Sequence, residues 1–368
     1  MRRRLGLLGA LVGGLLFLAG PAAAQETIRE ATGANAAAIQ AAVDAFRTDL
    51  GTLNPNNPGS VGSGRREINW DGTPDGDAAP GRLPGDFFNK VTPRGVIFEG
   101  SGTFQVSADD TTLAATPVRF GNLNPSYATA FAAFSAQRLF ATIGSNVVDV
   151  VFVVPGGTSP ATTRGFGAVF TDVDLAGSTR LEFFDESGEL ILSQNVMNTA
   201  GDGSLSFLGV SYPDARVARV RITAGDFPFA TPSSLEDVTQ GGIYDYVVMD
   251  DFIYGEPIAF TAVLTISPPS GTYTTRQSFD LVLLVTAAAG RTITGGTISF
   301  DGADVGVALA SCLVSGTLGA GGQSFRCPGV PAGSLGTGTH TLIVTLTFDD
   351  GSTARDKAVY VVSAATEP

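Results

Sequence analysis

Three short acidic clusters have the residue types and spacing from which a calcium site can be built. The segment DGTPDGD contains Asp71, TDVDLAGS contains Asp172 and Asp174, and VVMDDFIYGEP contains Asp250 and Asp251. Calcium takes roughly six to eight hard oxygen ligands, which carboxylates and backbone carbonyls supply. We therefore expect calcium as the cofactor and these aspartates as its candidate ligands.

Neither acidic loop is an EF-hand. Counted from Asp71, the twelfth position is Arg82, and counted from Asp172 it is Phe183. An EF-hand loop has a bidentate glutamate at that position. Several loop acids also have a simpler interpretation as solvated turn residues, namely Asp75, Asp77 and Asp174.

Asp250 and Asp251 stand side by side in a run that otherwise suits a buried strand. Adjacent strand residues point to opposite faces, so one of the two should face the interior. A buried carboxylate needs a cation, an arginine or several N–H donors to offset its desolvation. We expect one Asp to close a hydrogen-bond or calcium site that ties the last strand of its unit to the first. The second Asp should face solvent.

Trp70 is the only tryptophan and directly precedes Asp71 in the segment INWDG. Sugars stack on aromatic faces while carboxylates bind their hydroxyl groups, so Trp70 and Asp71 form a candidate glycan site. The alternative is core packing, because Ile68 shares the strand face of Trp70.

Several catalytic chemistries lack their residues. His340 is the only histidine, and it shares a strand face with Leu342 and Val344, so we expect it to point towards the core. Ser-His-Asp and Cys-His catalysis and a histidine zinc site are therefore unsupported. The glycine-rich segments lack the Gly-Lys-Ser/Thr ending of a phosphate loop. A glycosidase needs only two carboxylates, so that reaction stays open.

The first 24 residues have the parts of a secretory signal peptide: three arginines, an apolar stretch over 5–18, and small residues up to Ala24. A transmembrane anchor is the alternative, but the stretch is shorter than the ~20 residues that a spanning helix needs. We expect cleavage after Ala24, a secreted protein in the extracellular or periplasmic space, and no membrane insertion after cleavage.

Cys312 and Cys327 are the only cysteines. In an exported chain an even pair in one segment predicts a disulfide. A loop of about 15 residues would be stabilised by roughly 3 kcal/mol in the loop-entropy model. A reactive thiol pair is the alternative.

The chain is acidic, with a formal charge of −13 that becomes −16 once the three signal-peptide arginines are removed. Lys90 and Lys357 are its only lysines. Because no basic stripe is present, nucleic acid is not an expected partner. Short apolar segments punctuated by Gly, Pro, Asn and Asp are typical of all-β sandwiches.

The elements expected after the signal peptide are one helix and then many strands. A helix is predicted over 36–50, with Asn35 as its N-cap, Gly51 as its stop, and a stripe at Ile39, Val43, Phe46 and Leu50. A linker follows up to residue 64. The first strand unit has expected strands at 96–100, 104–108, 147–155, 165–174, 180–188, 189–196, 205–212, 217–225 and 244–255.

A second unit begins after Glu256-Pro257, with expected strands at 260–267, 279–287, 295–302, 340–352 and 357–362. Its run GTGTHTLIVTLTFDDGSTARDKAVYVV resembles the late strands of bacterial Ig-like domains, and the resemblance covers residues 257–363. It implies an Ig-like sandwich. The cysteine spacing does not fit the inter-sheet bridge of antibody domains, so only the architecture carries over.

The first unit resembles jelly-roll sandwiches of exported bacterial proteins in GFGAVFTDVD, LEFFDESGELI, FLGVSY and VVMDDFIYGEP. Its closing strand is also similar to the strand that ends MAM domains, although the MAM cysteines are absent. The resemblance implies that the last strand lies near the first, which would bring INWDG beside MDDFIYG. Several families of this architecture bind calcium or sugars.

The sequence thus predicts a mainly β protein with four segments: a signal peptide (1–24), a helix and linker (25–64), a jelly-roll-like β-sandwich (65–257) and an Ig-like β-sandwich (258–368). We expect a secreted, non-catalytic binding protein that acts at a cell surface, matrix or glycan and has a structural calcium site. The alternatives are a carbohydrate-active enzyme, either a glycosidase or a lyase, and a purely structural surface component.

Overall fold

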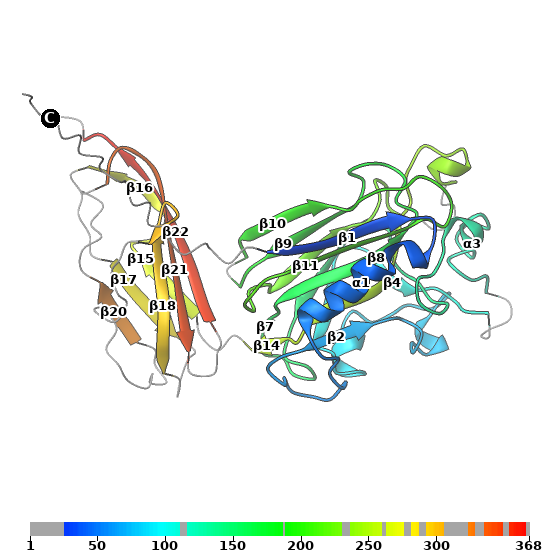
Figure 1. Cartoon of the computed structure of the whole chain (residues 1–368), viewed down its shortest axis with the longest axis horizontal. Helices are drawn as coiled ribbons and strands as arrows, with labels where there is room; N and C mark the ends of the chain where they lie inside the picture. Colours follow the sequence, from blue (N-terminus) through cyan, green and yellow to red (C-terminus); the bar gives the residue numbers. More distant parts are fainter. Residues whose placement is uncertain are drawn as a thin grey trace, which may run out of the picture.

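A computed structural model describes residues 26–110, 116–186, 188–229, 236–259, 263–275, 281–286, 292–304, 323–327, 335–348 and 353–365. The described chain consists mainly of β-strands in largely antiparallel sheets, and these form two groups that lie side by side (Figure 1). The predicted fold class, mainly β with an N-terminal helix and β-sandwiches, is confirmed.

Strand β1 (Thr27–Gly33) opens the described chain, and the sequence analysis did not predict it. Helix α1 (Ala36–Leu50) follows between Asn35 and Gly51, as predicted. The predicted apolar stripe is its buried face, made of Ile39, Val43, Phe46 and Leu50. Because a stripe of this kind must be covered, α1 lies on the outer face of a sheet against Val169, Leu205, Phe207 and Ile253.

The large sheet of the first sandwich has the strand order β1-β11-β8-β13-β5-β4, and β2 also pairs with β13. Its further strands are β2 (Arg65–Ile68), β4 (Thr103–Val106), β5 (Phe140–Ile143), β8 (Gly165–Thr171), β11 (Leu205–Ser211) and β13 (Val248–Gly255). Phe252 of β13 lies opposite Ile68 of β2. The expected neighbourhood of the INWDG and MDDFIYG segments is therefore confirmed.

The second sheet of this sandwich has the strand order β10-β9-β12-β6-β3. Its strands are β3 (Val96–Glu99), β6 (Val147–Phe152), β9 (Arg180–Phe184), β10 (Leu190–Asn195) and β12 (Arg219–Thr223). Val220 and Ile222 are buried, whereas Arg219 and Arg221 are bonded to Asp149 on the outer face. One hydrophobic core, with residues from both sheets, fills the space between them.

Short elements connect these strands. They are η1 (Asp75–Asp77), α2 (Phe87–Lys90), α3 (Tyr127–Ala130), η2 (Val238–Gln240), and the paired strands β7 (Ala161–Thr162) and β14 (Ile258–Ala259). Among the residues that the structure describes, no helix is both long enough and apolar enough to cross a membrane.

The second sandwich has its own sheets and its own core. One sheet contains β15 (Val263–Ser267), β17 (Leu281–Thr286) and β20 (Gln323–Cys327). The second sheet has the order β16 (Gly271–Thr274), β22 (Thr353–Ser363), β21 (Gly338–Phe348), β18 (Ile293–Phe300) and β19 (Ala303–Asp304). The described residues of its hydrophobic core run from Leu264 to Val362.

Two predictions fall outside the described residues. The signal peptide, residues 1–24, is one, and the Cys312–Cys327 disulfide is the second because Cys312 is not described. Both stay predictions, as do the boundaries at 64 and 257.

Candidate metal centre

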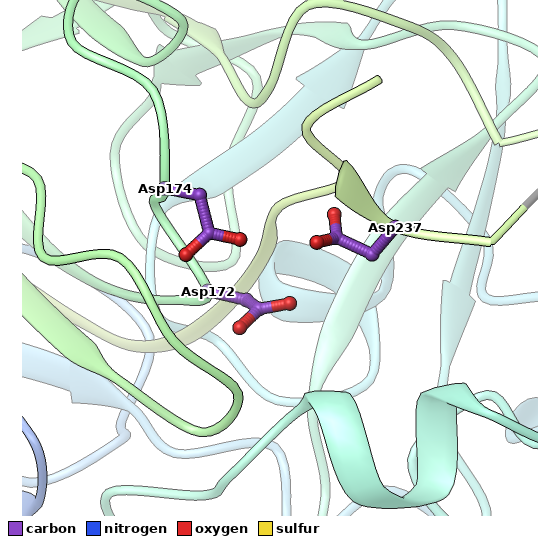
Figure 2. A group of neighbouring side chains, drawn as sticks. All are labelled: Asp172, Asp174 and Asp237. Carbon is purple, nitrogen blue, oxygen red and sulfur yellow. The ribbon is translucent and has the colours of Figure 1, made fainter. Parts of the chain in front are cut away.

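Three aspartates meet at the end of the large sheet where β8 stops (Figure 2). Each of Asp172, Asp174 and Asp237 offers a carboxylate oxygen, and these oxygens all lie within 4.8 Å of one another. The side chains are buried, with 0 %, 4 % and 0 % of each residue exposed. The sequence predicted Asp172 and Asp174 as ligands but not Asp237.

Asp172 and Asp174 are positioned by the chain as it leaves β8. Asp172 has a φ of 70°, in the left-handed region that residues other than glycine rarely adopt. Its backbone N–H donates to the Ser204 carbonyl oxygen at 2.9 Å, which holds the turn against the neighbouring connection. Strained backbone of this kind is often found at ligand sites.

Asp237 reaches the same point from a segment that precedes β13. Its side chain caps η2, where Oδ2 accepts the Thr239 N–H at 2.9 Å. Oδ1 accepts the Tyr246 N–H at 2.9 Å. Both oxygens of Asp237 are therefore fixed by backbone donors, which orients the carboxylate before any ion binds.

Asp172 and Asp174 differ from Asp237 in their hydrogen bonds. Oδ1 of Asp174 accepts the Gly201 N–H at 2.7 Å. Oδ2 of Asp174 and both carboxylate oxygens of Asp172 are buried and accept no hydrogen bond from the residues that the structure describes. Since buried polar atoms are almost always satisfied, these three oxygens indicate a missing partner.

The electrostatics of the group point to a cation. Burial, followed by the charge of Asp237, raises the pKa of Asp172 to about 9. Burial also raises the pKa of Asp174 to about 7, and Asp237 adds to this effect. In the described part of the chain, no Arg, Lys or His forms an ion pair with the three carboxylates. Closely spaced carboxylates disfavour one another's charged forms, and a bound cation reverses this.

Two further aspartates, Asp245 and Asp202, lie beside the triad. Asp245 is buried, and its carboxylate accepts the backbone N–H groups of Asp174 and Leu175 at 3.3 and 3.0 Å. Asp202 accepts the Thr239 hydroxyl at 2.9 Å. Both increase the negative potential at the triad, and Asp245 fixes the backbone beside Asp174.

The donor set decides which ion fits. The side-chain atoms that could bind a metal ion here are all carboxylate oxygens, which suit calcium, magnesium or manganese rather than softer metals. Calcium tolerates irregular oxygen sites and accepts backbone carbonyls, whereas magnesium demands near-octahedral geometry. Asp172, Asp174 and Asp237 could therefore hold a hard metal ion, and their chemistry is compatible with calcium.

Asp71 lies outside this triad. Its Oδ1 accepts the N–H groups of Gln137 and Arg138 at 3.0 and 3.1 Å, so its carboxylate fixes the turn before β5. Of its neighbours, Asp75 forms an ion pair with Arg138. The structure thus does not bring the first acidic cluster together with the second.

The Asp250–Asp251 pair also lies outside the triad, and the expectation that one of the two faces solvent is wrong. Their exposures are 0 % and 2 %. In the pairing of β13 with β8, Met249 lies opposite Phe170 and Phe252 opposite Ala168, with an irregular register between. This is a β-bulge, which places both aspartates opposite one residue and breaks the alternation of strand faces.

Protein donors hold the pair. Asp250 Oδ2 accepts the Phe134 N–H at 2.6 Å, and the Ser135 hydroxyl donates to Asp251 Oδ1 at 2.6 Å. Arg47 of α1 lies 3.4 Å from Asp251 Oδ2. The pair therefore ties β13 to the 134–135 segment and to α1, while the arginines of β12 bind Asp149 instead.

Trp70 is a core residue, and the glycan-platform interpretation is wrong. Only 1 % of Trp70 is exposed, and its indole stacks on Phe140 with ring centroids 4.3 Å apart. Its Nε1–H donates to the Asp250 carbonyl oxygen at 2.8 Å. An indole that is covered in this way has no free face for a sugar ring.

His340 lies at a strand end, as expected, and its ring nitrogens are satisfied. Nδ1 lies 2.7 Å from Asp301 Oδ2 and Nε2 lies 2.9 Å from the Gly336 carbonyl oxygen. The Asp301 hydrogen bond raises the pKa of His340. This histidine is half-buried rather than fully in the core.

Comparisons with known proteins leave the family open. No protein family model and no curated protein matches the chain. Among solved structures, fibronectin(III)-like modules of CbhA from Clostridium thermocellum are 14 % identical, with 61 % of this chain and 88 % of that chain covered and a TM-score of 0.19. Latent PorU from Porphyromonas gingivalis is 14 % identical over 60 % of this chain and 22 % of that chain, with a TM-score of 0.22.

A β-1,2-glucanase from Parabacteroides distasonis is 10 % identical over 86 % of this chain and 39 % of that chain, again with a TM-score of 0.22. Similarities at this level carry no argument about activity or ligand. The proposed function below therefore depends on the residues of this chain alone.

Proposed function

We propose that this chain is an exported, non-catalytic binding protein whose first sandwich is stabilised by calcium at Asp172, Asp174 and Asp237. The proposal depends on one observation about this cluster. Among the described residues, its buried carboxylate oxygens include three that accept no hydrogen bond, and no basic residue forms an ion pair with the cluster. An ion there would connect the turn after β8 to the segment before β13. Such a site stabilises a scaffold and leaves the outer loops available for recognition.

The partner we propose is a glycan or another cell-surface or matrix component, outside the cell or in the periplasm. The predicted signal peptide over residues 1–24 and the acidic composition support this location. A carbohydrate-active enzyme would need two accessible carboxylates. The adjacent acids Asp250 and Asp251 are both buried, so this pair does not support the enzyme alternative.

Calcium titration of the mature protein tests the metal site. An ion that binds only the folded state stabilises it by about 2.7 kcal/mol at a hundredfold excess over its Kd. We expect the melting temperature to rise with calcium, to rise less with magnesium, and to fall with a chelator. Asp172→Asn should abolish the calcium response, because both carboxylate oxygens of Asp172 lack a hydrogen-bond donor among the described residues.

Asp250→Asn is the matched control, because it alters a buried aspartate that lies outside the triad. Its calcium response should equal that of the wild type. A wild-type melting temperature that neither calcium nor chelator changes would exclude the metal site. Binding of the mature protein to a glycan array, with and without calcium, separately tests the proposed partner.

A further inference from the structure

The turn between β9 and β10 presents carboxylates at one end of the first sandwich. Asp185, Glu186 and Glu189 lie in this turn. The turn is closed by two backbone hydrogen bonds, from the Asp185 N–H to the Glu189 carbonyl and from the Gly188 N–H to the Asp185 carbonyl, each of 3.0 Å. The Asp185 carboxylate also accepts the Glu189 N–H at 3.0 Å. These hydrogen bonds fix Asp185 and Glu189 relative to each other.

The second sandwich presents a complementary face. Thr353, Arg355 and Lys357 alternate with the buried Ala354 and Ala358 along β22, so they share the outer face of that strand. Arg355 lies opposite Thr345 of β21, and Thr345 lies opposite Thr297 of β18. A band of hydroxyl and cationic side chains thus crosses three neighbouring strands.

These two surfaces meet. Arg355 Nη1 lies 2.6 Å from Asp185 Oδ2, and Lys357 Nζ forms an ion pair with Glu189 Oε1. The Arg355 and Asp185 side chains are 22 % and 2 % exposed, so this pair is largely removed from water. Residues of both sandwiches also line one polar cavity, namely Glu186, Asp214, Arg216, Thr297, Thr345, Thr353 and Arg355.

We infer that the β9–β10 turn and the outer face of β18, β21 and β22 form an electrostatic docking interface between the two sandwiches. The cavity lining contains no apolar side chain, and each sandwich has a hydrophobic core of its own. Charge pairing therefore carries the contact. The Lys357–Glu189 pair remains partly exposed to solvent. The screening length falls from about 10 Å at 0.1 M salt to about 3 Å at 1 M, so high salt weakens this pair and loosens the contact between the second sandwich and the turn.

The scarcity of lysine allows a direct test on the full mature chain. A carbodiimide joins a lysine amine to a carboxylate as an amide, with loss of water, only where the two groups touch. Lys357 and Lys90 are the only lysines, and Lys90 pairs with Asp86 at 2.5 Å within one helical turn. At low salt we expect mass spectrometry to find two coupled pairs, Lys357 with Glu189 and Lys90 with Asp86.

At 1 M salt the 357–189 product should be lost. The 90–86 product should persist, because the local chain keeps those two groups close together. Arg355→Gln should reduce the 357–189 product at low salt, since it removes the neighbouring ion pair. The matched control is Arg180→Gln, which removes an exposed pair with Glu182 inside the first sandwich and should leave the product unchanged.

The final part of the experiment exchanges the charges at positions 357 and 189. Lys357→Glu alone should abolish coupling between positions 357 and 189, and the double variant with Glu189→Lys should restore it. Two outcomes would overturn the inference. One is coupling at Lys90 with none between 357 and 189 at low salt. The second is a 357–189 product whose yield responds neither to salt nor to Arg355→Gln.

Discussion

Asp250 and Asp251 are adjacent carboxylates in the interior, and their environment separates their protonation. Burial and the charge of Asp251 raise the pKa of Asp250 well above its usual range. Burial also raises the pKa of Asp251, although the Ser135 hydroxyl and Arg47 oppose that effect. We therefore expect Asp250 to keep its proton to a higher pH than Asp251, whose carboxylate faces Arg47.

This arrangement predicts how stability depends on pH. The folded state binds the Asp250 proton more tightly than the unfolded chain, whose pKa is about 3.9. The associated stability is fully present below that pH and is lost as pH rises through the folded pKa, at up to about 1.4 kcal/mol per pH unit. Asp250→Asn imitates the protonated form, so its unfolding free energy should fall less steeply from about pH 4 upwards. Denaturant unfolding across pH measures the difference.

Asp251→Asn is the companion variant and should behave differently. It removes the charge that faces Arg47 and leaves the Ser135 hydroxyl with a weaker acceptor. We expect a loss of roughly 1–3 kcal/mol at neutral pH, in line with loss of a partner from a buried polar group. Equal pH profiles for both variants would show that the proton is not held at Asp250.

At the scale of elements, local patterns predicted much of the first sandwich. The apolar stripe of α1 was confirmed because it directly reports a buried face, and the strand expected over 217–225 is present as β12. Strand β1, with the sequence TIREATG, was missed because it is a polar edge strand that pairs with β11 only. The buried Asp250–Asp251 pair was misjudged because a bulge, which depends on the partner strand, overrides simple alternation.

The same limit applies to the triad of Asp172, Asp174 and Asp237, which could hold a metal ion. Asp172 and Asp174 were predicted because they stand together in one turn sequence. Asp237 comes from a distant segment and stands in SSLEDVTQG, whose composition is that of an ordinary loop. Only the tertiary pairing of β8 with β13 brings these residues together. The single available signal was the cap pattern of Asp237 before Thr239.

The contact between α1 and the large sheet depends on glycine. A Cβ placed on Gly209 of β11 would lie 2.7 Å from Phe46 Cγ, and one on Gly167 of β8 would lie 2.8 Å from Phe46 Cε1. The Phe46 ring therefore rests directly on the backbone of two strands. We expect Gly209→Ala to destabilise the protein by about 1–3 kcal/mol, as overpacking does. Chemical denaturation measures this loss.

Phe46→Leu should partly rescue Gly209→Ala, since the smaller side chain makes room for the added methyl group. Gly76→Ala is the control, because a Cβ there would meet no atom within 4 Å. Its unfolding free energy should stay near the wild-type value. If the losses of unfolding free energy in Phe46→Leu and Gly209→Ala simply add in the double variant, the proposed contact is contradicted.

At the scale of the molecule, the two sandwiches are connected by few and polar interactions. Strand β14 pairs with β7 of the first sandwich, whereas the core of the second begins at Leu264. The described ion pairs across the interface involve Asp185 and Glu189. Desolvation offsets much of the attraction in the largely buried Arg355–Asp185 pair, and the partly exposed Lys357–Glu189 pair contributes about 0–1 kcal/mol, so separation of the sandwiches should cost little.

The second sandwich should therefore fold without the first. We expect the isolated fragment 258–368, produced under oxidising conditions, to unfold cooperatively by circular dichroism and to give dispersed NMR signals. A shorter fragment, 263–368, should be equally stable, because residues 258 and 259 form β14 and pair outside the second core. The melting temperature of the second sandwich within the full chain should differ from that of the isolated fragment by no more than a few degrees. A fragment 258–368 that stays unfolded would show that the second core needs the first sandwich, and the boundary at 257 would then be wrong.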